Sequence, residues 1–115
     1  MPEAAFVLSP SRPVNERTMR LKDQDMIFAR RELLCCDLPD GSVILDPSSG
    51  VYYGLDAVGT YIWTLIQQPI RFEEIVGAVL NEYAVEPDRC FQDLQALFSE
   101  MVELHLVEIR DSEAN

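Results

Sequence analysis

The chain has 115 residues and a mass of 13.1 kDa, which is the size of one domain and too short for a TIM barrel or a full dinucleotide-binding sheet. Hydrophobic residues make up 48% of it, enough for a modest core, and the formal net charge is −11. Residues 51–115 hold twelve acidic residues but only Arg71, Arg89 and Arg110 as bases. Because nucleic-acid-binding modules need a basic surface, this distribution predicts that the protein binds no nucleic acid.

Targeting and redox signals indicate a cytoplasmic protein. No apolar run approaches the roughly 18 residues that cross a bilayer, and Glu3 stands where a signal peptide would carry positive charge. The cysteine count is odd, Cys35 and Cys36 are adjacent, and no CxxC occurs. We therefore expect no membrane partner and no structural disulfide.

The N-terminal half begins with an arm and continues as strands. Residues 1–27 are weakly apolar and interrupted by prolines, so they are expected to be a partly flexible arm. Three short apolar runs follow, at residues 33–38, 42–46 and 51–55, joined by the turn sequences Pro39-Asp40-Gly41 and 47–50. This pattern predicts a three-stranded antiparallel meander, which helices must cover on one face.

The C-terminal half predicts three helices. Asp56 is expected to cap the first, which ends at Gln68-Pro69, and the second runs from about residue 73 to 83. The third begins with Pro87 at its first position and continues to about residue 104, and residues 106–109 can form a short final strand. The expected fold class is α+β, with a domain over residues 28–109 and a tail over residues 110–115.

The third predicted helix has an unusually wide apolar face. At 100° per residue its apolar side chains span roughly 160°, more than the arc of about 100° that docks a surface helix on one core. The pattern alone favours a central, well-buried helix. The other interpretation is that one flank, which holds Cys90, Leu97 and Met101 beside Asp93, lines a groove.

The residues that carry chemistry are few. His105 is the only histidine and falls at a predicted helix end, where a capping or surface role is expected. Cys35 and Cys36 lie in a predicted strand, so their side chains point to opposite faces and cannot share a zinc ion. No glycine-rich phosphate loop is present. The sequence therefore predicts a protein that is not an enzyme and that holds no metal or cofactor.

One ordered set of motifs points to a family. Residues 45–63 contain a strand, a turn that ends in Gly50, a Tyr-Tyr-x-Leu strand and a capped helix with Gly59 and Trp63. This order and spacing resembles the core of the PqqD-like family, and the similarity extends over about residues 28–109. The chain departs from the family pattern at Asp56, at Gln68-Pro69, at Arg71 and at His105, which stands where a glycine is usual. These departures leave the helix ends open.

The resemblance implies a RiPP recognition element, a small winged helix-turn-helix domain that binds the leader segment of a ribosomally made precursor peptide. In that family the leader adds as a strand to the third strand of the meander, and its apolar side chains fill the cleft beside the third helix. The peptide-binding residues so implied are Val51, Tyr52, Tyr53, Gly54, Leu55, Cys90, Asp93, Leu94, Leu97 and Met101. The partner would be a modifying enzyme such as a protease, cyclase or radical-SAM enzyme, with lasso-peptide biosynthesis the preferred pathway and quinone-cofactor biosynthesis left open.

Two other interpretations stay open. The first is a winged-helix regulator, although the second and third predicted helices are strongly acidic. The second is a scaffold that binds only a partner enzyme, with the third strand occupied by the chain's own arm or by a second copy of the protein.

Overall fold

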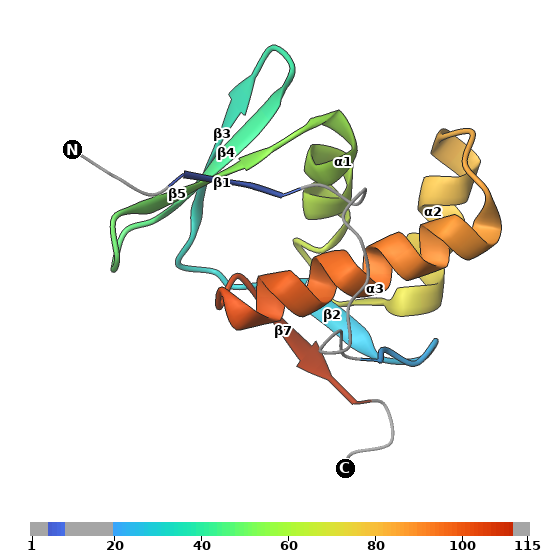
Figure 1. Ribbon diagram of the computed structural model, residues 1–115. Coiled ribbons are helices and arrows are strands. Elements are labelled where there is room, and N and C mark those ends of the chain that lie inside the picture. Colours follow the sequence, from blue (N-terminus) through green and yellow to red (C-terminus); the bar gives the residue numbers. More distant parts are fainter. Residues whose placement is uncertain (1–4, 9–19, 112–115) are drawn as a thin grey trace.

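The computed structural model describes residues 20–111 in full and residues 5–8 by their backbone. The fold is α+β, with two mainly antiparallel sheets and three helices (Figure 1). Its elements are β1 (Ala5–Leu8), β2 (Met26–Ala29), β3 (Leu34–Leu38), β4 (Gly41–Asp46), β5 (Val51–Leu55), α1 (Ala57–Leu65), β6 (Ile70–Arg71), α2 (Phe72–Glu82), α3 (Pro87–Glu103) and β7 (Val107–Arg110).

The larger sheet contains the predicted meander and one strand more. Its order is β1-β5-β4-β3, with β3 antiparallel to β4 and β4 antiparallel to β5. The additional strand, β1, comes from the N-terminal arm and pairs in parallel with β5. The expectation of three strands was therefore incomplete, and the chain's own arm occupies the third strand of the meander.

A second sheet, of order β6-β2-β7, was only partly predicted. The strand expected over residues 106–109 is present as β7, but β2 and β6 were missed. β6 has two residues, and β2 begins within the range assigned to the arm. Strands of two to four residues are too short to show an alternation of apolar and polar residues in the sequence. They form because they pair with strands far away in the chain.

The start of α1 follows the sequence prediction. Asp56 is its N-cap, and its Oδ1 accepts a hydrogen bond from the Gly59 backbone N–H at 2.7 Å. A Cβ at Gly59 would lie 3.2 Å from that same oxygen, a tight contact, so the glycine lets the cap approach closely. Asp56 thus caps the helix although it departs from the family pattern at this position.

The start of α2 is capped by backbone carbonyl groups of the loop before β2. The backbone N–H groups of Phe72 and Glu73 donate to the carbonyl oxygens of Asp25 and Asp23, at 2.9 and 3.0 Å. The Arg71 N–H donates to the Glu74 carboxylate at 3.2 Å. Free N–H groups at a helix start are satisfied by any nearby acceptor, which explains how Arg71 is tolerated there.

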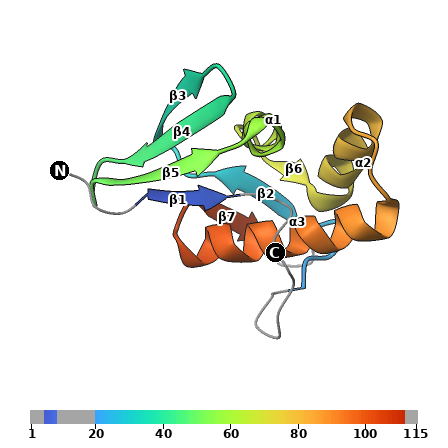
Figure 2. The same cartoon turned by 45° about the horizontal axis from the view of Figure 1, so that its top comes forward.

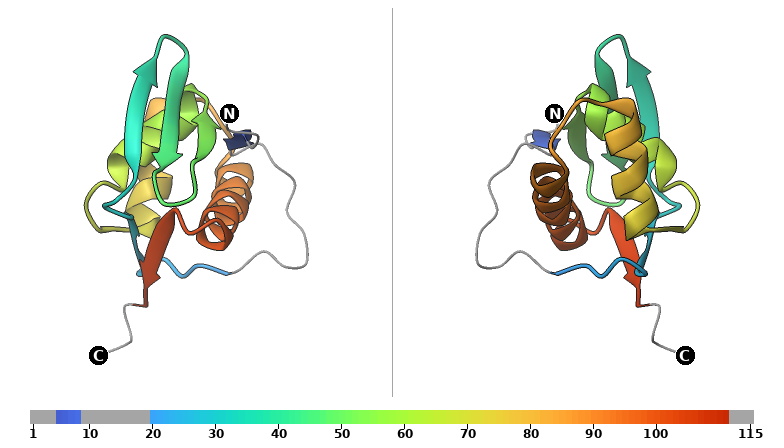
Figure 3. Two further views of the ribbon diagram at one scale, coloured as in Figure 1. Left: turned by 90° about the vertical axis from the view of Figure 1, so that its left-hand side faces the viewer. Right: turned by 90° about the vertical axis from the view of Figure 1, so that its right-hand side faces the viewer.

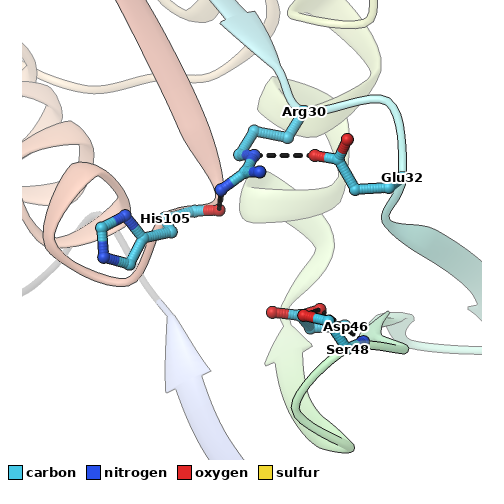
Figure 4. A network of polar contacts seen from close by, with 5 residues as sticks. All are labelled: Arg30, Glu32, Asp46, Ser48 and His105. Atoms are coloured by element: carbon cyan, nitrogen blue, oxygen red, sulfur yellow. Dashed lines mark hydrogen bonds and ion pairs between the residues drawn. The ribbon is translucent and has the colours of Figure 1, made fainter.

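The end of α3 is a Schellman turn centred on His105. Its backbone N–H donates to the carbonyl oxygen of Val102, and the N–H of Leu106 donates to that of Met101. His105 has a φ of 61°, the left-handed conformation that glycine usually supplies. The Arg30 guanidinium lies between the His105 carbonyl oxygen, 3.5 Å from its Nη1, and the Glu32 carboxylate, 2.7 Å from its Nε (Figure 4). These contacts hold the turn that sends the chain from α3 into β7.

The core lies between the two sheets and the helices, with α3 packed along one side of the molecule (Figure 3). A polar contact also ties residues near the arm to α3. The side-chain amide of Gln95, itself buried, accepts from the Leu21 N–H at 2.7 Å and donates to the Leu21 carbonyl oxygen at 3.0 Å. The fully buried side chains are Phe72, Phe98, Ile27, Ile44, Ile62, Ile66, Ile75, Leu94, Leu97, Met101 and Leu106.

Candidate functional site

The strand β5 buries the side chains of two of its residues and exposes that of one. Tyr53 and Leu55 are each 5% exposed and belong to the core, whereas Tyr52 is 36% exposed. One edge of β5 pairs with β4, and the backbone groups of the other edge are those that an added strand would use. The side chains of β5 therefore fix the strand to the core, while its outer edge provides main-chain donors and acceptors.

In this structure the outer edge of β5 carries β1. The register places Ala5 opposite Tyr52 and Leu8 opposite Leu55, so β1 covers nearly the whole strand. Figure 2 shows β1 running between β5 and α3, and the side views of Figure 3 agree. The position that the resemblance assigns to a peptide is thus filled by a segment of the same chain.

The two α3 residues expected deepest in the cleft are closed off. Leu97 and Met101 are 0% exposed and join the same core cluster as Tyr53 and Leu55. The wide apolar arc of α3 is therefore explained by packing on more than one side, and both of these residues belong to the core.

Three other predicted residues do line an open pocket. Cys90, Asp93 and Leu94, all on the first half of α3, border a cavity of about 270 Å³. Its other walls come from α1, the end of α2 and the segment between α2 and α3: Val58, Val79, Tyr83, Ala84 and Val85. Sequence reasoning missed this second wall, although its residues lie within the range 28–109 over which the resemblance extends.

The pocket is apolar with a carboxylate at its border. Burial raises the pKa of Asp93, and Arg89, whose Nε lies 3.4 Å from Oδ2, opposes this shift. The Asp93 side chain is 18% exposed and that of Arg89 is 67% exposed. Burial, with a smaller contribution from Asp93, also raises the pKa of the Cys90 thiol, so Cys90 acts here as an apolar wall residue.

The tyrosine on the opposite wall is held by an aromatic contact. The rings of Tyr83 and Tyr61 are 5.8 Å apart in an edge-to-face arrangement. Desolvation raises the pKa of the Tyr83 phenol, and the nearby Glu82 adds to the shift. The pocket therefore combines apolar walls with polar groups at Asp93 and Tyr83, a combination that fits an apolar side chain flanked by a hydrogen-bond donor.

The remaining candidates from the sequence lie elsewhere. Cys35 and Cys36 are exposed on β3, Cys90 is buried, and all three are free thiols. His105 is exposed at the end of α3. Among residues 20–111 and 5–8 no group of three or more metal-ligating side chains comes together, and no helix in those ranges is long and apolar enough to span a membrane.

Comparisons with known proteins now bear on this site. No curated protein sequence matches the chain. The structure is similar, with a TM-score of 0.65 and 32% sequence identity, to a chain of the solved structure of TbiB1 in complex with the TbiA(beta) leader peptide. The similarity covers 76% of this chain and 99% of that one. The family model of coenzyme PQQ synthesis protein D (PqqD) matches residues 41–107, more than half of the sequence, so the chain belongs to the PqqD family.

Proposed function

We propose that this protein is a RiPP recognition element, which binds the leader segment of a ribosomally made precursor peptide and delivers it to a modifying enzyme. The observation that carries the proposal is the similarity to TbiB1, whose structure contains a leader peptide, over nearly the whole of that chain. The proposal assigns binding to this protein and no catalytic step.

The leader would bind by adding a strand to the outer edge of β5. The pairing of β1 there supports this mode, because it demonstrates that the edge and the space beside α3 accommodate an extended segment. Main-chain pairing tolerates many sequences, so the choice between leaders would rest on side-chain pockets. Among the described residues, the cavity bordered by Cys90, Asp93 and Leu94 is one such pocket beside α3.

Charge would add a preference for basic leaders. The chain carries a net charge of −11, and Asp93 places a carboxylate at the pocket itself. A Lys or Arg beside the anchoring apolar residue would be attracted to this carboxylate, and association would be faster at low salt.

The charge of α2 and α3 argues against the winged-helix regulator, since a recognition helix for DNA needs basic residues. The two helices contain one basic residue, Arg89, and these acidic ones: Glu73, Glu74, Glu82, Asp88, Asp93, Glu100 and Glu103.

Three finer points belong to the same proposal. They are the winged helix-turn-helix topology, a protease, cyclase or radical-SAM enzyme as the receiving partner, and lasso peptides as the product class. The family resemblance supports the topology, and a leader-bound relative is compatible with each of the partners.

Fluorescence polarisation with labelled leader peptides tests the proposal. The probes are the TbiA(beta) leader and the N-terminal segment of the precursor encoded nearest to this protein. We expect saturable binding at micromolar or tighter affinity. Asp93→Ala should weaken it roughly tenfold if Asp93 accepts a hydrogen bond from a charged donor, and Val85→Asp should weaken it by placing a charge at the apolar wall.

Controls separate the site from the function. Glu103→Ala removes an exposed acid from the far end of the same helix and should leave affinity within twofold. Leu97→Ala is less informative, because deletion of a fully buried leucine opens a core cavity and costs about 2–5 kcal/mol. If Asp93→Ala and Val85→Asp both bind the leader as tightly as the unsubstituted protein does, the pocket is not part of the binding site. A folded protein that binds neither leader would contradict the proposed function.

A further inference from the structure

The segment that covers β5 has the properties of a peptide ligand. Ala5-Phe6-Val7-Leu8 is an uncharged apolar sequence, and its four residues pair in register with Tyr52 to Leu55. It lies between β5 and α3, where the proposed leader would lie (Figure 2). A peptide that uses the same main-chain groups of β5 cannot bind while β1 is paired there.

We propose that β1 is a built-in competitor of the leader, so that a leader binds only by replacing β1 at the edge of β5. This inference rests on the proposed function and adds to it the regulation of the same site. When no leader is present, β1 protects the outer edge of β5 from solvent and from unrelated strands. The edge then becomes available only to a peptide whose pairing with β5 is more stable than that of Ala5–Leu8.

The pairing between β1 and β5 is short, as a segment that a leader must replace needs to be. β1 has four residues and pairs in parallel, the arrangement that is slightly less stable per residue than the antiparallel one. The buried Gln95 amide holds Leu21 on α3, so the arm remains attached to the domain when β1 leaves β5. A segment tethered in this way competes at an effective concentration on the order of millimolar, although its intrinsic affinity is low.

The affinity for a leader then depends on how often the outer edge of β5 is free of β1. The apparent dissociation constant of a leader equals its intrinsic value divided by the fraction of molecules in which the edge is free. If β1 is paired nine-tenths of the time, leader binding is weakened about tenfold. Loss of β1 pairing should therefore tighten leader binding, which a purely structural role of β1 would not produce.

A reversible disulfide between β1 and β5 provides the direct test. Ala5 and Tyr52 are register partners, and neighbouring strands lie about 4.8 Å apart, within the range of Cα separations of about 4.4–6.8 Å that a disulfide spans. The variant is Ala5→Cys with Tyr52→Cys in the full chain, with Cys35→Ser and Cys36→Ser to remove the exposed thiols. Polarisation with both leader probes, the TbiA(beta) leader and the N-terminal segment of the precursor encoded nearest to this protein, is measured on the oxidised and reduced forms of this one variant.

We expect the oxidised form to lose leader binding by at least tenfold and the reduced form to recover it. The matched control is Ala5→Cys alone in the same background, whose affinity should not respond to oxidation. A second variant acts in the opposite direction: Val7→Pro fixes φ near −65°, away from the value of about −120° in a parallel strand, and should tighten leader binding roughly threefold or more, compared with Val7→Ala, which leaves φ free.

The outcomes distinguish this inference from the proposed function. Equal leader binding by the oxidised and reduced forms, with the disulfide confirmed by mass, overturns the competition and leaves the function in place. Failure of every form to bind, Val7→Pro included, overturns the function and the competition together. Binding that is detectable only in Val7→Pro supports both.

Discussion

The two edges of the larger sheet differ in what lies beside them. The β5 edge is backed by α3 and covered by β1, whereas β3, at the other end of the sheet, is exposed at all five of its residues. β3 is apolar apart from Asp37, and its Leu34 and Leu38 are 56% and 51% exposed. The turn of the β3–β4 hairpin lies beside the start of α1, but Figure 2 shows no helix along the outer side of β3, so a strand added there would gain main-chain pairing but no helix to pack against. The presence of α3 beside β5, more than an apolar composition, distinguishes the edge that pairs with β1 from the edge at β3.

The largest expected difference between the two edges is in their tolerance of charge. Tyr53→Asp places a carboxylate in the core beneath β5, and we expect a loss of about 3 kcal/mol or more in the free energy of unfolding. An aspartate on the exposed β3 edge, introduced by Leu38→Asp, should change the free energy of unfolding by no more than about 0.5 kcal/mol. Urea denaturation followed by tryptophan fluorescence of Trp63 measures both. A similar cost in the two variants would show that the β3 edge is as strongly packed as the β5 edge.

The next effect concerns how the chain leading to β1 is attached. Gln95→Leu leaves the buried N–H and carbonyl oxygen of Leu21 without partners, which should cost about 2 kcal/mol. Gln92→Leu, an exposed position on the same helix, is the matched control and should be near neutral. Equal midpoints for the two variants in thermal unfolding would mean that the Leu21 contact contributes nothing to stability.

The smallest effect is pH-dependent. The folded-state pKa of Asp93 is raised, so its ionised form is disfavoured in the folded protein and its contribution to stability falls as pH rises above its ordinary value of about 3.9. Asp93→Asn should therefore raise Tm at pH 7, and this gain should disappear as the pH falls to about 3 and below, where Asp93 is mostly protonated in both states. The control is Asp88→Asn in the first turn of α3, which should lower Tm at pH 7 because it loses a favourable interaction with the helix dipole. A gain for Asp93→Asn that is constant from pH 4 to 7 would contradict this assignment.

Local signals made much of the fold predictable. The Asp56 cap, Pro87 at the start of α3 and the Pro39-Asp40-Gly41 turn act through neighbouring residues, so the three helices and the β3–β4–β5 meander follow from them. The strands β1, β2 and β6 are short and exist through partners far away in the sequence. No local pattern in residues 1–27 specifies that Ala5–Leu8 pairs with a strand more than 40 residues later.

For the candidate site, the sequence grouped residues of α3 but did not predict how they are arranged in the structure. The helical arc grouped Cys90, Leu97 and Met101, but the structure places Cys90 in an open pocket and closes over Leu97 and Met101. The difference depends on which elements pack against α3, and helical periodicity does not contain that information. Similarly, the burial of Gln95 depends on its hydrogen bonds with Leu21, a partner 74 residues away in the sequence that no local pattern indicates.

The placement of β5 between β4 and β1 has a consequence for its amide hydrogens. Along a strand, successive residues direct their backbone groups to opposite neighbours, so alternate residues of Val51–Leu55 pair with β4 and with β1. In hydrogen–deuterium measurements the first set is protected until the sheet itself opens, while the second set is protected only as long as β1 stays in place. One strand of five residues thus contains its own internal reference, and the ratio of the two protection factors measures how tightly the protein holds its N-terminal segment before any peptide is added.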